Sequence, residues 1–280
     1  SGHNDHNYFE VAHTIKYVND MVGNNLKLYT FVDNHDVERI YTKLNNKAHF
    51  EPVHVMLYTL PGIPSLYYGS EFGIEGRKER NSDDSLRPAL NYDDYKDAVH
   101  TNPCTQLIAT LGKLRQNIKA LCYGDYKQLE LQNMSFAYAR IWDGKDVITT
   151  VNNGDNEACM NLEAGTMTPK YVGVLTGRSV TVNDGRIQVS VPANSGEVWI
   201  PEALMSEGLA PLKTEESTES FTDSVVIDWF KSYEDMTVAE LQEAILEKMR
   251  GNGQVTDYML KTVRENTHHE SLVNWVKSFR

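Results

Sequence analysis

The sequence has few cysteines and few positive charges for its length. Its 280 residues include only three cysteines, Cys104, Cys122 and Cys159. An odd number without a Cys-x-x-Cys spacing predicts neither a disulfide framework nor a zinc site, and we expect buried, reduced thiols. Lysine and arginine number 27 against 39 aspartate and glutamate residues, which gives a net charge of −12. This balance argues against a nucleic-acid partner, because nucleic-acid affinity rests on clustered Lys and Arg.

Long apolar runs and targeting signals are also missing. No apolar run approaches the ~20 residues of a membrane-spanning helix, so we expect no membrane partner. The first residues, Ser1-Gly2-His3-Asn4-Asp5, have neither the basic region nor the apolar core of a signal peptide. Together with the reduced cysteines, this favours a cytoplasmic location. A secreted location stays open if a leader lies upstream of Ser1.

The first 122 residues alternate between helical and extended patterns. Apolar residues recur at helical spacing over residues 8–22, 50–60 and 107–118, and short strands are expected over residues 26–32 and 65–68. Alternation of this kind predicts βα units with a parallel sheet. We therefore expect an α/β fold in residues 1–122.

The apolar period changes to two from about Tyr123. Short strands are expected over residues 136–142, 147–151, 171–175, 187–191 and 198–200. Asp-Gly and Asn-Gly pairs supply turns between several of them. Residues 123–202 are therefore predicted to form an antiparallel β-sandwich, and residues 203–280 a polar linker and a small helical tail without recognisable chemistry.

The residues that carry chemistry follow the first expected strand, in Phe31-Val32-Asp33-Asn34-His35-Asp36. Side chains at the carboxyl end of a strand in a (β/α)₈ barrel face the active site. A carboxylate such as Asp36 accepts hydrogen bonds from vicinal sugar hydroxyls, and a neutral His35 donates one. The alternative is structural: Asn34 or Asp36 caps the following helix.

A second segment, LPGIPSLYYGSE over residues 60–71, follows one helix later. In their order and spacing, the two segments resemble the seventh and eighth strands of the α-amylase family of retaining glycoside hydrolases. The loop Asn81–Pro88 resembles the polar loop that follows the family's eighth strand. The resemblance covers roughly residues 6–200, and it implies a partial (β/α)₈ TIM barrel followed by the family's C-terminal β-sandwich.

The resemblance also assigns roles to individual residues. It implies that Asp36 is the carboxylate that stabilises the transition state and that His35 and Asn34 bind substrate beside it. Arg39 is a further candidate to reach substrate, although a surface salt bridge is an equal alternative. Asp84 and Arg87, in the polar loop, are candidates for contacts with neighbouring sugar units. The implied partner is an α-glucan such as starch, glycogen or a maltooligosaccharide.

Two parts of the family's machinery are not found. The family's nucleophile lies in a Gly-Phe-Arg-x-Asp-like motif on the fourth strand and its general acid is a Glu after the fifth, and neither motif occurs here. A retaining glycosidase needs both groups. We therefore expect a C-terminal fragment that is not hydrolytic by itself. Its two strands would pair with the remaining barrel portion or with a second copy, because isolated strand pairs are marginally stable.

Two alternatives to a hydrolase stay open at this point. One is an α-glucanotransferase of the same family, and the other is a non-catalytic carbohydrate-binding or interaction module. No cofactor is expected in this chain. Family members often hold calcium between the barrel and an inserted domain, so calcium is an expectation only for a longer parent protein.

Overall fold

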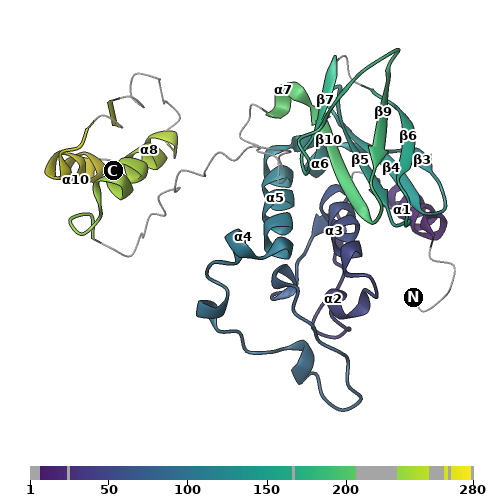
Figure 1. The fold of residues 1–280 in the computed structure, drawn as a ribbon, viewed down its shortest axis with the longest axis horizontal. Helices are drawn as coiled ribbons and strands as arrows, with labels where there is room; N and C mark the ends of the chain where they lie inside the picture. Colours follow the sequence, from purple (N-terminus) through teal and green to yellow (C-terminus); the bar gives the residue numbers. More distant parts are fainter. Residues whose placement is uncertain are drawn as a thin grey trace. The chain divides into compact units, whose positions relative to one another are not determined.

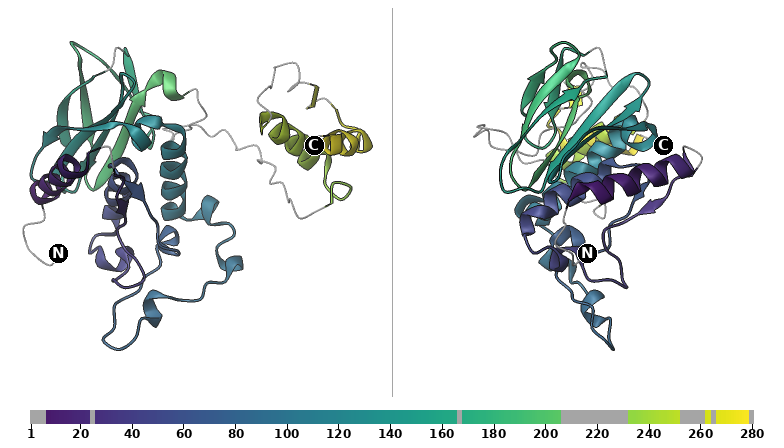
Figure 2. Two further views of the ribbon diagram at one scale, coloured as in Figure 1. Left: turned by 180° about the vertical axis from the view of Figure 1, so that it is seen from behind. Right: turned by 90° about the vertical axis from the view of Figure 1, so that its right-hand side faces the viewer.

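The computed structural model describes residues 7–23, 26–165, 168–205, 232–251, 262–263 and 266–278. The chain divides into two compact units, Ser1–Glu216 and Ser217–Arg280. Figure 1 shows the helices and the sheets of the first unit, and Figure 2 gives two further views of them. The expected linker is covered only in part, since residues 206–231 lie outside the described residues.

The first part of the first unit consists of helices and connecting loops, with two very short strands among them. Its elements are α1 (Tyr8–Val22), β1 (Tyr29–Thr30), α2 (Ile40–Lys43), η1 (Lys47–His49), α3 (Phe50–Thr59), β2 (Ile63–Pro64), η2 (Ser70–Phe72), η3 (Asp84–Leu86), η4 (Tyr92–Asp94), α4 (Ala98–Thr101), α5 (Pro103–Asn117) and α6 (Lys119–Tyr123). Sequence signals fix the ends of the longer helices. The Asn102 side chain caps α5, and Pro103 stands in its first turn, where a missing N–H costs nothing.

The strands β1 and β2 pair in parallel, as the alternating pattern predicts, but they are shorter than expected. The strand expected over residues 26–32 is limited to Tyr29–Thr30. The strand expected over residues 65–68 is wrong, because pairing is centred on Ile63–Pro64. The carbonyls of Tyr67 and Tyr68 instead accept hydrogen bonds from the Ser70 amide and the Arg39 guanidinium.

The second part of the unit contains the antiparallel strands β3 (Asp125–Leu131), β4 (Ser135–Trp142), β5 (Lys145–Asn152), β6 (Ala158–Glu163), β7 (Lys170–Gly173), β8 (Ser179–Thr181), β9 (Arg186–Val191) and β10 (Ser195–Pro201), followed by α7 (Glu202–Met205). Six of them form a sheet in the order β3-β4-β5-β10-β7-β8, and β6 pairs with β9. Asp143-Gly144 and Asp184-Gly185 both have positive φ, so the turns expected at these dipeptides are confirmed.

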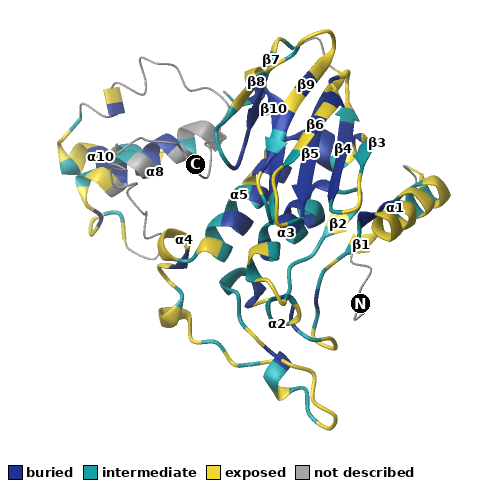
Figure 3. Cartoon of the chain, turned by 45° about the vertical axis from the view of Figure 1, so that its right-hand side comes forward, coloured by how far each residue is buried: buried dark blue, intermediate teal, exposed yellow. Residues whose placement is uncertain are grey.

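The six-stranded sheet is packed on both faces, and Figure 3 shows its inner strands β4, β5 and β10 mostly buried. The edge strands β3 and β8 are largely exposed or half-buried. One apolar cluster joins its Tyr138 and Val198 to Val55 of α3 and Leu111 of α5. The other joins the opposite face to β6 and β9 through residues that include Ala139, Trp199, Leu162 and Val189. Residues from both sides of position 122 thus share one core, and the division into 1–122 and 123–202 stays a prediction.

The second unit has a small core of its own. Its described helices are α8 (Val238–Gly251) and α10 (His269–Ser278). Leu241 and Ile245 of α8 pack with Leu272 and Val276 of α10, and all four are fully buried. In neither unit is any described helix long and apolar enough to cross a membrane.

Candidate functional site

A tight turn after β1 presents His35 and Asp36. The side-chain oxygen of Asn34 accepts hydrogen bonds from the backbone N–H groups of Asp36, at 2.8 Å, and Val37, at 3.2 Å. Asn34 therefore stabilises the turn, as an Asx turn does. The side chains of His35 and Asp36 are 57% and 60% exposed, with His35 Nε2 at 3.2 Å from Asp36 Oδ2.

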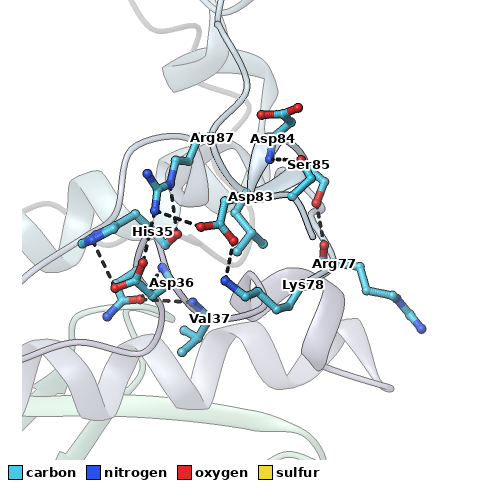
Figure 4. A network of polar contacts seen from close by, with 12 residues as sticks. His35, Asp36, Val37, Arg77, Lys78, Asp83, Asp84, Ser85 and Arg87 are labelled. Atoms are coloured by element: carbon cyan, nitrogen blue, oxygen red, sulfur yellow. Dashed lines mark hydrogen bonds and ion pairs between the residues drawn. The ribbon is translucent and has the colours of Figure 1, made fainter. Parts of the chain in front are cut away.

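Arg87 connects this turn to the loop that follows β2. Its Nε donates to the His35 carbonyl at 3.2 Å, and its Nη2 lies 3.1 Å from Asp36 Oδ1 and 3.2 Å from Asp83 Oδ2. Figure 4 shows the Arg87 guanidinium between the turn and Asp83. The structure thus brings together three of the expected residues, His35, Asp36 and Arg87, from the turn after β1 and the loop after its parallel neighbour β2.

Asp83 is the member of this group that sequence reasoning missed. It is held by both Arg87 and Lys78, and the hydrogen bond from the Lys78 ammonium lowers the pKa of the Asp83 carboxyl. Asp84, the expected residue, points away from the cluster in Figure 4. The sequence feature that could have identified Asp83 is its position four residues before Arg87, a spacing that favours an ion pair.

Arg39 lies behind the site and is fully buried, which rules out the surface salt bridge. Its Nη1 donates to the Tyr68 carbonyl and its Nη2 to the Leu86 carbonyl, both at 2.9 Å. The guanidinium also lies over the Tyr67 ring, with its central carbon 4.6 Å from the ring centroid. Arg39 therefore binds backbone and aromatic groups of this chain.

Asp33 is buried beside Arg39. Its Oδ2 accepts hydrogen bonds from the Ile40 amide at 2.9 Å and the Ser70 hydroxyl at 2.7 Å. Three atoms of this neighbourhood, Asp33 Oδ1, Arg39 Nε and His54 Nε2, have no hydrogen-bond partner among the described residues. Burial lowers the pKa of His54 to about 4. The site thus consists of an exposed charged cluster on a buried polar support.

The chemistry of the exposed cluster suits a neutral ligand rich in hydroxyl groups. Two carboxylates offer hydrogen-bond acceptors, and one guanidinium and one imidazole offer donors. The Tyr67 ring centroid lies 6.4 Å from that of His35.

A cavity of about 610 Å³ lies elsewhere, between α1, β1, α3 and Trp142, and its lining includes neither His35 nor Asp36. Among the described residues, no group of three or more metal-ligating side chains is arranged to hold an ion. Calcium stays an expectation for a longer parent.

Comparison with known proteins supports the resemblance drawn from the motifs. Residues 4–117 match the family model described as alpha amylase, catalytic domain. This segment contains every residue of the exposed cluster and its buried support. The chain is also similar to a cyclomaltodextrin glucanotransferase of Bacillus sp. (strain 1-1), with 29% identity over 195 residues, 65% of this chain and 26% of that protein.

Solved structures with a similar fold include an α-amylase from Malbranchea cinnamomea, with a TM-score of 0.63 and 22% identity over 74% of this chain and 44% of that one. A debranching enzyme from Nostoc punctiforme, soaked with acarbose, has a TM-score of 0.53 and 26% identity over 68% and 38% of the two chains. These neighbours are barrel proteins of the α-amylase family. The chain spans about a quarter of the length of the curated relatives it matches.

Proposed function

We propose that this chain supplies part of the sugar-binding site of a retaining glycoside hydrolase of the α-amylase type that acts on α-glucan. The observation that carries the proposal is the meeting of His35 and Asp36, in the turn after β1, with Asp83 and Arg87, in the loop that follows the adjacent parallel strand β2. Barrel enzymes collect their functional side chains at this edge. The match of residues 4–117 to an α-amylase catalytic domain supports the same conclusion.

In this proposal Asp36 and His35 act on the sugar ring at which the bond is cleaved. The Asp36 carboxylate accepts hydrogen bonds from two vicinal hydroxyls, and these bonds strengthen as the ring becomes oxocarbenium-like. The His35 imidazole donates to a further hydroxyl. Arg87, itself paired with Asp83, holds the Asp36 carboxylate in place, and Arg87 and Asp83 offer a donor and an acceptor to the neighbouring sugar unit.

Double displacement requires a nucleophile and a general acid about 5–5.5 Å apart, and Asp36 fills neither role in the proposal. We therefore propose that these 280 residues bind sugar without turnover and that a longer parent protein carries out the reaction. The exposure of the β1–β2 pair supports the proposal that further parts of a barrel cover it in the parent protein. Tyr29 and Ile63 on these strands are 67% and 50% exposed, whereas parallel sheets are normally covered on both faces.

An α-glucanotransferase is the second candidate within the same chemistry. The observation that favours it is the similarity to cyclomaltodextrin glucanotransferases. The two reactions share the residues described here and differ in whether water or a sugar hydroxyl accepts the glucan. Product analysis of the parent enzyme, with and without an added acceptor sugar, separates them.

Calorimetric titration with maltohexaose tests the proposed site. We expect the chain to bind the sugar, and Asp36→Asn or Asp83→Asn to weaken binding about tenfold, since each removes a charged hydrogen-bond acceptor. Asp84→Asn is the matched control, because the neighbouring carboxylate points away from the cluster, and it should leave the affinity unchanged. Equal affinity in all four proteins, or no binding at all, would contradict the proposal.

The alternative to an enzyme part is a non-catalytic carbohydrate-binding module. Turnover distinguishes the two, measured for the longer parent protein and for its Asp36→Asn variant. If Asp36 stabilises the transition state, the substitution lowers kcat by several orders of magnitude, far more than the about tenfold loss of sugar binding accounts for. A parent that binds maltohexaose and never hydrolyses or transfers it supports the binding module instead.

A further inference from the structure

The loop that carries Asp83 and Arg87 touches the His35–Asp36 turn through more than the exposed ion pairs. Behind the cluster, Arg39 Nη2 and the Tyr67 hydroxyl both donate to the carbonyl of Leu86, at 2.9 and 3.2 Å. Leu86 is fully buried and directly precedes Arg87. The peptide before Arg87 is therefore held from inside the protein.

Arg39 is equally fixed at its own end. Its backbone N–H donates to the Gly76 carbonyl at 3.0 Å, and its Nη1 donates to the Tyr68 carbonyl. One side chain thus spans from the turn after β1 to the residues after β2 and to the loop that holds Arg87. A planar guanidinium donates along several directions at once, which a lysine ammonium does not reproduce.

Two glycines make room for this side chain. A Cβ atom on Gly69 would lie 3.2 Å from Arg39 Nη1, and one on Gly76 would lie 3.0 Å from Arg39 Cδ and 2.4 Å from the Ser85 carbonyl oxygen. The space occupied by Arg39 is therefore closed on two sides by backbone. A side chain larger than hydrogen at either glycine would crowd Arg39.

From these contacts we propose that Arg39 is a positioning residue. It fixes residues 84–87 against the turn after β1 and so sets the orientation of the Arg87 guanidinium toward Asp36. The effect on sugar affinity rests on the proposed function of that cluster. The effect on the loop does not, and the two are measured separately.

Hydrogen–deuterium exchange tests the structural half without any ligand. In Arg39→Lys, amides in residues 83–88 should exchange about tenfold faster, because the Leu86 and Tyr68 carbonyls no longer share one donor group. Arg140→Lys is the matched control: Arg140 is also buried and donates to the carbonyls of Gly124 and Thr59. It should leave residues 83–88 unchanged. Unchanged exchange in Arg39→Lys, or equal acceleration in both variants, overturns the proposal.

The variant Tyr67→Phe keeps the test decisive if Arg39→Lys does not fold. It removes the second donor to the Leu86 carbonyl and leaves Arg39 unchanged. We expect a smaller acceleration confined to the same residues. Acceleration that spreads evenly over the first unit, or none in residues 83–88, counts against positioning.

Maltohexaose titration tests the functional half by a double-mutant cycle. If Arg39 acts through Arg87, Arg39→Lys weakens binding about tenfold in the wild-type background and has almost no effect in Arg87→Ala. The fall in Tm should be equal in the two backgrounds. An undiminished loss of affinity in Arg87→Ala overturns the proposal. Failure of the wild-type chain to bind maltohexaose refutes the proposed function, and the exchange experiment still decides the role of Arg39.

Discussion

Asp33, Asn34 and Asp36 lie within four positions and serve three different purposes. Asp33 is buried and accepts from the Ile40 amide and the Ser70 hydroxyl, Asn34 closes the turn, and Asp36 is exposed toward Arg87. The sequence motif pointed to the candidate site, but residue types alone did not separate these roles. These roles depend on which side chain points into the protein. That direction goes with contacts to residues after β2: Ser70 for Asp33 and Arg87 for Asp36.

His54 provides a pH test at the scale of single residues. Burial lowers its pKa from 6.5 to about 4, so between these values the unfolded chain binds a proton that the folded chain does not. The free energy of unfolding should therefore fall as the pH drops from about 6.5 to about 4, with about 3 kcal/mol from this residue.

Urea unfolding at several pH values measures this contribution. His54→Gln should remove about that much of the pH dependence over the interval, while His100→Gln, at an exposed position, should leave it intact. Identical pH profiles for His54→Gln and the wild-type chain would contradict the assignment of His54 as a buried neutral residue.

At the scale of elements, the longer helices and the turns were predictable, and the barrel-type strands were not. The helical spacing of apolar residues located α1, α3 and α5 because that signal is local. The extents of β1 and β2 depend on pairing: Pro64 has no N–H, and the Tyr68 carbonyl is used by Arg39. The pairing of six strands in one sheet likewise depends on contacts between residues distant in sequence.

Gly62 is the residue at which the approach of β1 and β2 is most easily tested. Its φ is +117°, and an added Cβ would lie 2.8 Å from the Leu28 carbonyl oxygen. We expect Gly62→Ala to destabilise the first unit by about 2 kcal/mol.

The matched substitution is Gly112→Ala within α5, where the nearest atom to an added Cβ is 4.0 Å away. It should stabilise the protein by up to about 1 kcal/mol, because glycine is a poor helix former. Thermal unfolding of the two variants measures both effects. A Gly62→Ala protein as stable as the wild type would mean that the two strands do not approach as described.

At the scale of the whole molecule, each of the two units packs its described apolar residues separately from the other unit. Leu111 is fully buried in the first and Leu241 in the second. A Leu→Ala change in a packed core costs about 2–5 kcal/mol. We expect Leu241→Ala to accelerate hydrogen exchange in α8 and α10 of the second unit alone, and Leu111→Ala to accelerate it in the first unit alone, where Leu111 shares a cluster with α3 and the six-stranded sheet. Acceleration of both units by either change would contradict independent cores.

The central claim is that His35, Asp36, Asp83 and Arg87 form one sugar-binding surface. NMR titration of the 280-residue chain with maltohexaose tests it most directly. The account predicts saturable chemical-shift changes of the His35 imidazole and Arg87 Nε–H signals, and in Asp36→Asn these changes should need about ten times more sugar to reach half-saturation. Shifts confined to other residues, or half-saturation at the same sugar concentration in Asp36→Asn, would contradict it.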